Sequence, residues 1–166
     1  MADSKSDLAA AVEEMFPGHP VERKKSVGEK QRRLTIKTEK DDEVVLARLA
    51  AGLADKGERT ADAVFVCRSK NPQRLLVLVV ELKGSDFPHA LTQIEQTAER
   101  YCRKATGKPH GKNIQPSHGG KVVGLVSCRQ AQKDQNKIRL LRKKGIIAIH
   151  VKDYEITLSE LYKRAG

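Results

Sequence analysis

Aromatic side chains are scarce in this sequence, and tryptophan is absent. Phe, Tyr and Trp together make up 4% of the 166 residues. Proteins that hold single-stranded nucleic acid without sequence preference stack successive bases on aromatic side chains. The composition is poorly supplied for such a stacking surface, so single strands are not the ligand that it favours.

Cysteine is also rare, and its pattern excludes two kinds of stabilised fold. Cys67, Cys102 and Cys128 are far apart, odd in number and without a Cys-x-x-Cys pair. Neither a disulfide framework nor a zinc knuckle is indicated, and the interval between His110 and His118 matches no zinc spacing. We expect buried thiols in a reducing compartment.

Long apolar runs are missing as well. None approaches the ~20 residues of a membrane-spanning helix, and the first sixteen residues carry Asp3, Asp7, Glu13 and Glu14. The sequence therefore predicts a soluble, cytoplasmic protein, associated with the nucleoid if its source is bacterial.

Positive charge is what the sequence has in excess. Lys and Arg number 32 against 21 Asp and Glu, which leaves a formal charge of +11. Such a surplus of positive charge does not help the chain to fold, and it usually indicates a polyanionic binding partner. With so few aromatic residues, the expected partner is duplex or branched DNA rather than a single strand.

Hydrophobic period and capping or turn residues predict alternating helices and strands. The expected helices span residues 6–16, from about 41 to Gly57, 87–101, 130–144, and a short segment after Thr157, which has Glu160 at capping-box spacing. The expected strands span residues 62–67, 75–83, 122–128 and 146–151, and the first two form a hairpin. Continuous apolar runs in these strands predict burial on both faces. The fold class is α/β, with a mixed central β-sheet flanked by helices.

The chain divides into an N-terminal part, 1–40, and a core, 41–166, within one globular domain overall. The N-terminal part is expected to be a helix followed by a basic arm, in which Leu34-Thr-Ile36 is a short strand and the rest lies outside the core. The helix after it places Leu46, Leu49 and Leu53 on one face, with Thr38 as its N-cap.

A charged triplet ends the most apolar run. After Leu75 to Val80, which contains no polar residue, come Glu81, Leu82 and Lys83. Side chains alternate along a strand, so Glu81 and Lys83 emerge on one face. Asp62 opens the preceding strand of the hairpin, where antiparallel pairing can set it beside the end of its partner.

Phosphodiester hydrolysis needs these side chains. Carboxylates and carbonyls are hard ligands for Mg²⁺, and a nearby cation can orient the attacking water. We assign Asp62, Glu81 and the Leu82 carbonyl as metal ligands and Lys83 as the group that orients or activates water. The alternative is that charged residues simply terminate buried strands, which is common in a chain that is 32% charged.

Asp62, eighteen intervening residues and then Glu81-Leu82-Lys83 resemble the motif of the PD-(D/E)xK nuclease superfamily, over Asp41 to about Val151. Ala61 stands where the motif usually has proline. The resemblance implies a restriction-endonuclease-like core of helix, β-hairpin or three strands, helix, strand, helix and strand. It also implies a Mg²⁺-dependent DNA endonuclease, restriction-type or resolvase-like, in which Mn²⁺ can replace Mg²⁺.

The resemblance also implies a polar residue from the helix after the lysine and an acid from the helix before the hairpin. Gln93 is the candidate for the first, because it lies at the edge of the apolar stripe. One subgroup has Gln-x-x-x-Tyr on this helix, where this chain has Thr97 before Tyr101. Asp42 and Glu43 are candidates for a third acid, although acids in a first helical turn also favour the helix dipole.

Basic residues outside the motif are candidates for phosphate contacts, which give affinity but little sequence choice. They are Arg23, Lys24, Lys25, Arg32, Arg33, Lys104, Lys108, Lys112 and Lys121. The arm at 23–33 and the loop at 106–120 are the expected DNA-reading additions. A homodimer is expected, because cutting both strands with one site per chain is simplest with two chains. The alternatives are a catalytically inactive nucleic-acid-binding module of the same fold and a protein-interaction scaffold.

Overall fold

The computed structural model describes residues 4–29, 32–49, 61–70, 73–82, 87–102, 121–128 and 134–166. The helices are α1 (Ser4–Met15), α2 (Phe87–Thr97), α4 (Gln135–Lys143) and α5 (Leu158–Ala165), and α2 continues into a π-helical turn, η2 (Ala98–Cys102). The strands are β1 (Val21–Glu22), β2 (Ser26–Glu29), β3 (Arg32–Lys37), β4 (Glu43–Arg48), β5 (Ala63–Lys70), β6 (Gln73–Leu82), β7 (Lys121–Ser127), β8 (Ile146–Val151) and β9 (Glu155–Thr157).

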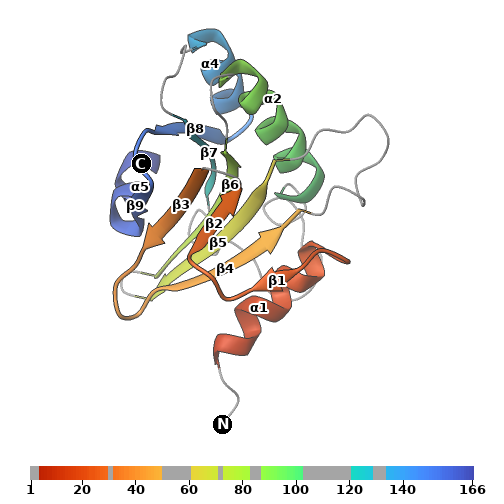
Figure 1. Ribbon diagram of the computed structural model, residues 1–166, viewed down its shortest axis with the longest axis vertical. Coiled ribbons are helices and arrows are strands. Elements are labelled where there is room, and N and C mark those ends of the chain that lie inside the picture. Colours follow the sequence, from red (N-terminus) through yellow and green to blue (C-terminus); the bar gives the residue numbers. More distant parts are fainter. Residues whose placement is uncertain are drawn as a thin grey trace.

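A six-stranded mixed sheet with the order β1-β4-β5-β6-β7-β8 forms the centre of the fold (Figure 1). The pairs β1–β4, β4–β5 and β5–β6 are antiparallel, whereas the pairs β6–β7 and β7–β8 are parallel. A second sheet has the order β2-β3-β9. The predicted α/β class, with a mixed central sheet flanked by helices, is confirmed.

Each face of the central sheet is buried under different elements. One face packs against α1, α2 and α4 through Phe16, Leu91 and Leu141, and the other packs against the small sheet and α5 through Ile36 and Leu161. Because both faces are covered, the strands read as continuous apolar runs rather than as alternating ones.

Helix α2 lies unusually close to the sheet at Gly124 on β7. A Cβ atom at this position would lie 2.5 Å from Ile94 Cγ2 on α2. Ordinary carbon contacts are about 3.5–4.0 Å, so only glycine fits here without a shift of the helix or of the isoleucine. The glycine therefore fixes the distance between α2 and the sheet.

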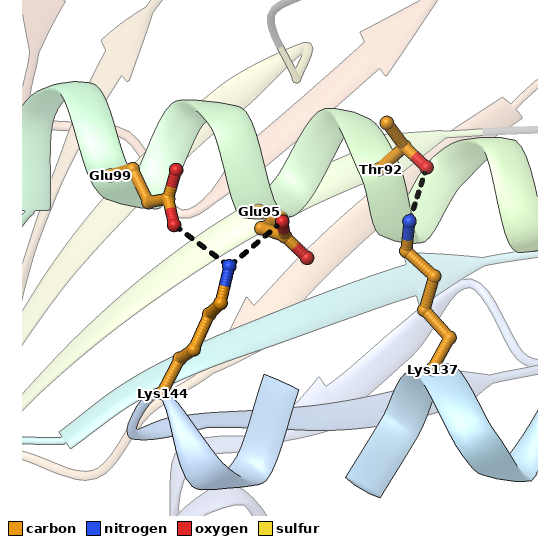
Figure 2. A network of polar contacts seen from close by, with 5 residues as sticks. All are labelled: Thr92, Glu95, Glu99, Lys137 and Lys144. Carbon is orange, nitrogen blue, oxygen red and sulfur yellow. Dashed lines mark hydrogen bonds and ion pairs between the residues drawn. The ribbon is translucent and has the colours of Figure 1, made fainter. Parts of the chain in front are cut away.

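Helix α4 lies beside α2 and is joined to it by two lysines (Figure 2). The ammonium of Lys144 lies 3.1 Å from carboxylate oxygens of both Glu95 and Glu99, and Lys137 donates to the Thr92 hydroxyl at 2.7 Å. The carboxylates and the hydrogen bonds to them raise the pKa of Lys144. Both lysines therefore serve the packing of the two helices.

The helix expected from residue 41 is wrong, because this segment forms strand β4. Val44 and Leu46 pack toward the small sheet, whereas Val45 and Ala47 pack toward the helices. In a strand buried on both faces, apolar and polar residues do not alternate. The spacing of Leu46, Leu49 and Leu53 matches that of an apolar stripe on a helix, so it predicted the wrong element. Residues 50–60 lie outside the described part of the chain.

The prediction that residues 19–40 lie outside the core is wrong for part of this segment. Val21 pairs with Ala47 of β4, and Leu34 and Ile36 of β3 are fully buried. The short strand expected at Leu34-Thr-Ile36 is present as the centre of β3. Most residues of this segment are basic or polar, so its few buried apolar residues did not form a pattern that predicts a strand.

The other expected elements agree with the structure within a few residues. The hairpin is formed by β5 and β6, and α2, β7 and β8 lie where hydrophobic period placed them. Thr157 caps α5 by accepting a hydrogen bond from the Glu160 N–H at 3.1 Å. Helix α4 begins later than predicted, at Gln135, with Asp134 as its N-cap. None of the described helices is long and apolar enough to cross a membrane.

Candidate active site

Asp62 is held against the end of β6 by two hydrogen bonds on either side of Glu81. The Asp62 N–H donates to the Val80 carbonyl at 3.1 Å, and Asp62 Oδ2 accepts from the Leu82 N–H at 2.7 Å. These contacts bracket Glu81, which lies between their partners in the chain. The meeting of the two strand ends that the sequence suggested is therefore present.

Glu81 lies on the α2 side of the sheet and is 2% exposed. Its neighbours along β6 show the alternation, because Val79 packs against the helical face whereas Val80 and Leu82 pack against the small sheet. A carboxyl group at this depth needs polar partners or a cation to offset the loss of water. A charged residue that merely ends a strand would lie at the surface, whereas Glu81 is buried.

Thr97 joins helix α2 to the start of the Asp62 segment. Its hydroxyl accepts a hydrogen bond from the Ala61 N–H at 2.7 Å and donates to the Gln93 carbonyl at 2.8 Å. Thr97 is fully buried. Sequence reasoning had singled out Thr97 only as the residue that replaces glutamine in a motif, and it missed that this hydroxyl positions the residue before Asp62.

Gln93 lies between Ala90 and Thr97 on one face of α2, and both of these neighbours are buried. Spacings of three and four residues place side chains next to each other on a helix. Gln93 therefore lies next to the face of α2 that packs on the sheet, and its role as a fourth site residue stays a prediction. Lys83 lies outside the described residues.

The side chains at this edge suit a Mg²⁺ ion. Asp62, Glu81 and the Leu82 carbonyl supply hard oxygen donors, and Mg²⁺ is usually held by one or two carboxylates with water and substrate phosphate completing its shell. Among the described residues no three His, Cys, Asp or Glu side chains gather as a metal site. The Mg²⁺ assignment requires only two carboxylates, those of Asp62 and Glu81.

The two candidates for a third acid lie at the opposite end of the sheet. Asp42 accepts a hydrogen bond from the Ser69 hydroxyl at 2.7 Å, and Glu43 forms an ion pair with Arg68 at 2.9 Å. Ser69 is seven residues along β5 from Asp62, which corresponds to roughly 20 Å at the rise of a strand. The structure therefore does not bring either acid to the site.

The N-terminal basic residues do not form one cluster. Lys25 lies beside Ile36 near one end of β3, whereas Arg32 lies at the other end, where its Nε donates to the Ser127 carbonyl at 3.3 Å. Arg33 donates to Ser26, the residue after Lys25, whereas Lys24 is ion-paired with Glu22 and Arg23 is exposed. Lys104, Lys108 and Lys112 lie outside the described residues, and of Lys121 only the backbone is described.

Arg32 brings its charge to the carboxyl ends of β7 and β8. Burial raises the pKa of the Cys128 thiol, and the nearby Arg32 guanidinium partly opposes that rise. His150 Nε2 lies 2.8 Å from the Cys128 carbonyl, which makes this nitrogen the donor. Cys67 is also buried, and burial raises the pKa of its thiol. The expectation of buried thiols is confirmed for these two cysteines.

His19 packs behind the far end of α2. Its Nε2 lies 3.1 Å from the Tyr101 hydroxyl, and the two rings meet edge to face. Burial, together with the charge of Arg100, lowers the pKa of His19. The neutral imidazole is therefore the form that this packing favours.

We compared the chain with known protein families, with curated proteins and with solved structures, and none of the three comparisons found a match. The case for a function therefore rests on the site itself, which consists of Asp62 and the buried Glu81 at one end of the hairpin and of Thr97, which links α2 to the residue before Asp62.

Proposed function

We propose that this protein is a Mg²⁺-dependent DNA endonuclease of the PD-(D/E)xK type. The observation that carries the proposal is the pair of hydrogen bonds that hold Asp62 against Val80 and Leu82, with the buried Glu81 between them. These bonds set Asp62 beside the backbone on either side of Glu81, and Lys83 follows two residues later in the sequence. The formal charge of +11 supports a polyanionic substrate.

Asp62, Glu81 and the Leu82 carbonyl would hold the metal ion. Bound Mg²⁺ would neutralise the negative charge that develops on the phosphate. The hydrogen bond from the Leu82 N–H fixes the orientation of the Asp62 carboxylate. Lys83 would orient the attacking water, and helix α2 limits the access of bulk water from the side of the sheet on which Glu81 lies.

The order of elements supports a restriction-endonuclease-like core after residue 61. Hairpin β5–β6 is followed by α2, then β7, α4 and β8, with the last three strands parallel. The element before the hairpin differs from the expected core, because β4 is a strand rather than a helix. A homodimer, restriction-type or resolvase-like cleavage and the use of Mn²⁺ in place of Mg²⁺ stay predictions.

The test is cleavage of plasmid, linear and four-way-junction DNA with Mg²⁺, Mn²⁺ or EDTA. We expect Asp62→Asn, Glu81→Gln and Lys83→Ala each to lower the cleavage rate at least a hundredfold, the scale on which loss of one charge-stabilising group acts. Asp42→Asn is the matched control, because it removes a carboxylate at the opposite end of the sheet. It should keep the wild-type rate.

Each result separates the proposal from its alternatives. Cleavage that survives the substitutions at Asp62 and Glu81 would refute the site. Tight DNA binding without cleavage under any metal would favour an inactive binding module, whereas binding partners retained at high salt and no DNA affinity would favour an interaction scaffold.

A further inference from the structure

Tyr154 is the one aromatic residue of this chain with a largely open surface. All six aromatic residues lie in the described part of the chain. Three phenylalanines and Tyr101 are buried, and Tyr162 is partly covered. Tyr154, between β8 and β9, is 50% exposed. Tyr154 is therefore the aromatic side chain most accessible to a ligand.

Arg32 is fixed above the ring of Tyr154. Its guanidinium carbon lies 5.3 Å from the ring centroid, within the range of a cation–π contact. Nε donates to the Ser127 carbonyl at 3.3 Å and Nη2 to the Lys152 carbonyl at 3.4 Å. The ends of β7 and β8 thus hold the guanidinium in place, so little side-chain entropy is left to lose when a ligand binds.

This stacked pair lies at the same edge of the sheet as the candidate active site. Ser127, whose carbonyl anchors Arg32, pairs with Leu82 in the register of β6 and β7, and Leu82 donates to Asp62. Neighbouring strands are about 4.8 Å apart, so the Arg32 anchor lies roughly 10 Å from Asp62. Arg32 belongs to the small sheet, so the pair lies at this edge on the side of the central sheet opposite to Glu81 and α2.

We propose that Arg32 and Tyr154 form the contact for one unstacked base of the DNA substrate, at the edge of the sheet where the phosphate is cut. An intact duplex keeps its bases stacked inside, whereas a branch point or an unpaired position offers a base to an open ring. The substrate class is therefore branched or locally unpaired duplex DNA, with Arg32 also adding positive charge near the backbone. This inference rests on the proposed function for its position at the edge where DNA is cut, but the base contact can be tested without cleavage.

The chain offers a matched control pair. Arg74 lies 5.2 Å from the ring centroid of Tyr162, in the same kind of cation–π contact, but at the other end of β6. Tyr162 also hydrogen-bonds Ser69, which belongs to that opposite edge. Substitutions in the two pairs remove the same chemistry from two different ends of the sheet.

The experiment measures binding in EDTA, so that no DNA is cut. The probes are a three-way junction with 2-aminopurine at the branch point and a perfect duplex of the same sequence. We expect Tyr154→Ala to weaken junction binding on the order of tenfold and to abolish the fluorescence change, while Tyr154→Phe keeps both. Arg32→Lys should weaken the junction more than the duplex, and Arg74→Ala should change neither.

Equal affinity of wild type and Tyr154→Ala for the junction would overturn the proposal, as would an equal loss for junction and duplex. Circular dichroism of Tyr154→Ala confirms that the variant is folded. The proposed function can fail separately: junction binding with the fluorescence change but no cleavage in Mg²⁺ leaves the base contact standing and refutes the nuclease. Cleavage by an enzyme without junction preference refutes the base contact alone.

Discussion

Replacing Gly124 with alanine tests whether the close packing of α2 on the sheet is needed for stability and for the site. The added methyl group would lie 2.5 Å from Ile94 Cγ2 and 3.4 Å from Ile94 Cδ1. The first distance is about 1 Å shorter than an ordinary carbon contact. The isoleucine has to change rotamer or the helix has to move away from β7.

The expected loss follows from these distances. Overpacking a buried site typically costs about 1–3 kcal/mol, and alanine recovers about 0.5–1 kcal/mol of the chain entropy that glycine loses in a strand. We therefore expect Gly124→Ala to lower the free energy of unfolding by about 1–2 kcal/mol. Because α2 also carries Gln93 and Thr97, we expect DNA cleavage to fall in the variant even where it is fully folded.

Urea denaturation followed by circular dichroism measures this change. Ile94→Leu removes the branching Cγ2 atom while keeping the side-chain volume, so Gly124→Ala should be milder in that background. Gly28→Ala is the matched control, because its Cβ would meet nothing closer than 3.5 Å and should change stability little. An unchanged stability of Gly124→Ala, or an equal loss in both backgrounds, would refute the packing argument.

Three further predictions concern single side chains. Thr97→Val leaves the buried Ala61 N–H without its acceptor and should lower the free energy of unfolding by about 1–3 kcal/mol and slow cleavage, whereas Thr97→Ser should restore both. His19 has a lowered pKa in the folded protein, so its contribution to stability is present above the unfolded pKa of about 6.5 and is lost as the pH falls through the folded value. His19→Gln, which can still hydrogen-bond Tyr101, should reduce the loss of stability between pH 7.5 and 5 in urea titrations. Cys67 should resist a thiol reagent at pH 8 in native protein and react in urea; rapid native labelling identified by mass spectrometry would contradict its burial.

The sequence predicted the elements whose apolar residues follow one period, and it failed where both faces of a strand are buried. Helix α2 is amphipathic, so the spacing of apolar residues such as Leu91 and Ile94 predicts it. Strand β4 contains Val44 and Val45 on opposite faces, and their burial depends on the helices on one side and the small sheet on the other. Local spacing cannot distinguish such a strand from a buried helix.

In the candidate site, too, the sequence predicts what depends on local spacing and not what depends on contacts between distant segments. The position of Glu81 on one face follows from alternation along β6, which is a local property of a strand. The contact of Asp62 with Leu82 depends on hairpin register, and the hydrogen bond from Ala61 to Thr97 depends on where a helix far along the chain is placed. Arg32 and Ser127 are more than ninety residues apart, so no local pattern connects them.

The parallel pairing of β3 with β9 has a consequence for how the chain folds. Thr35 pairs with Glu155 and Lys37 with Thr157, so residues from early and late parts of the chain complete one small sheet. Such non-local pairing slows folding, because the closing of a long loop precedes any gain from the contacts. Until β9 has been synthesised, the edge of β3 that pairs with it stays open. Because an open strand edge can pair with other chains, we expect aggregation to be most likely before β9 is complete.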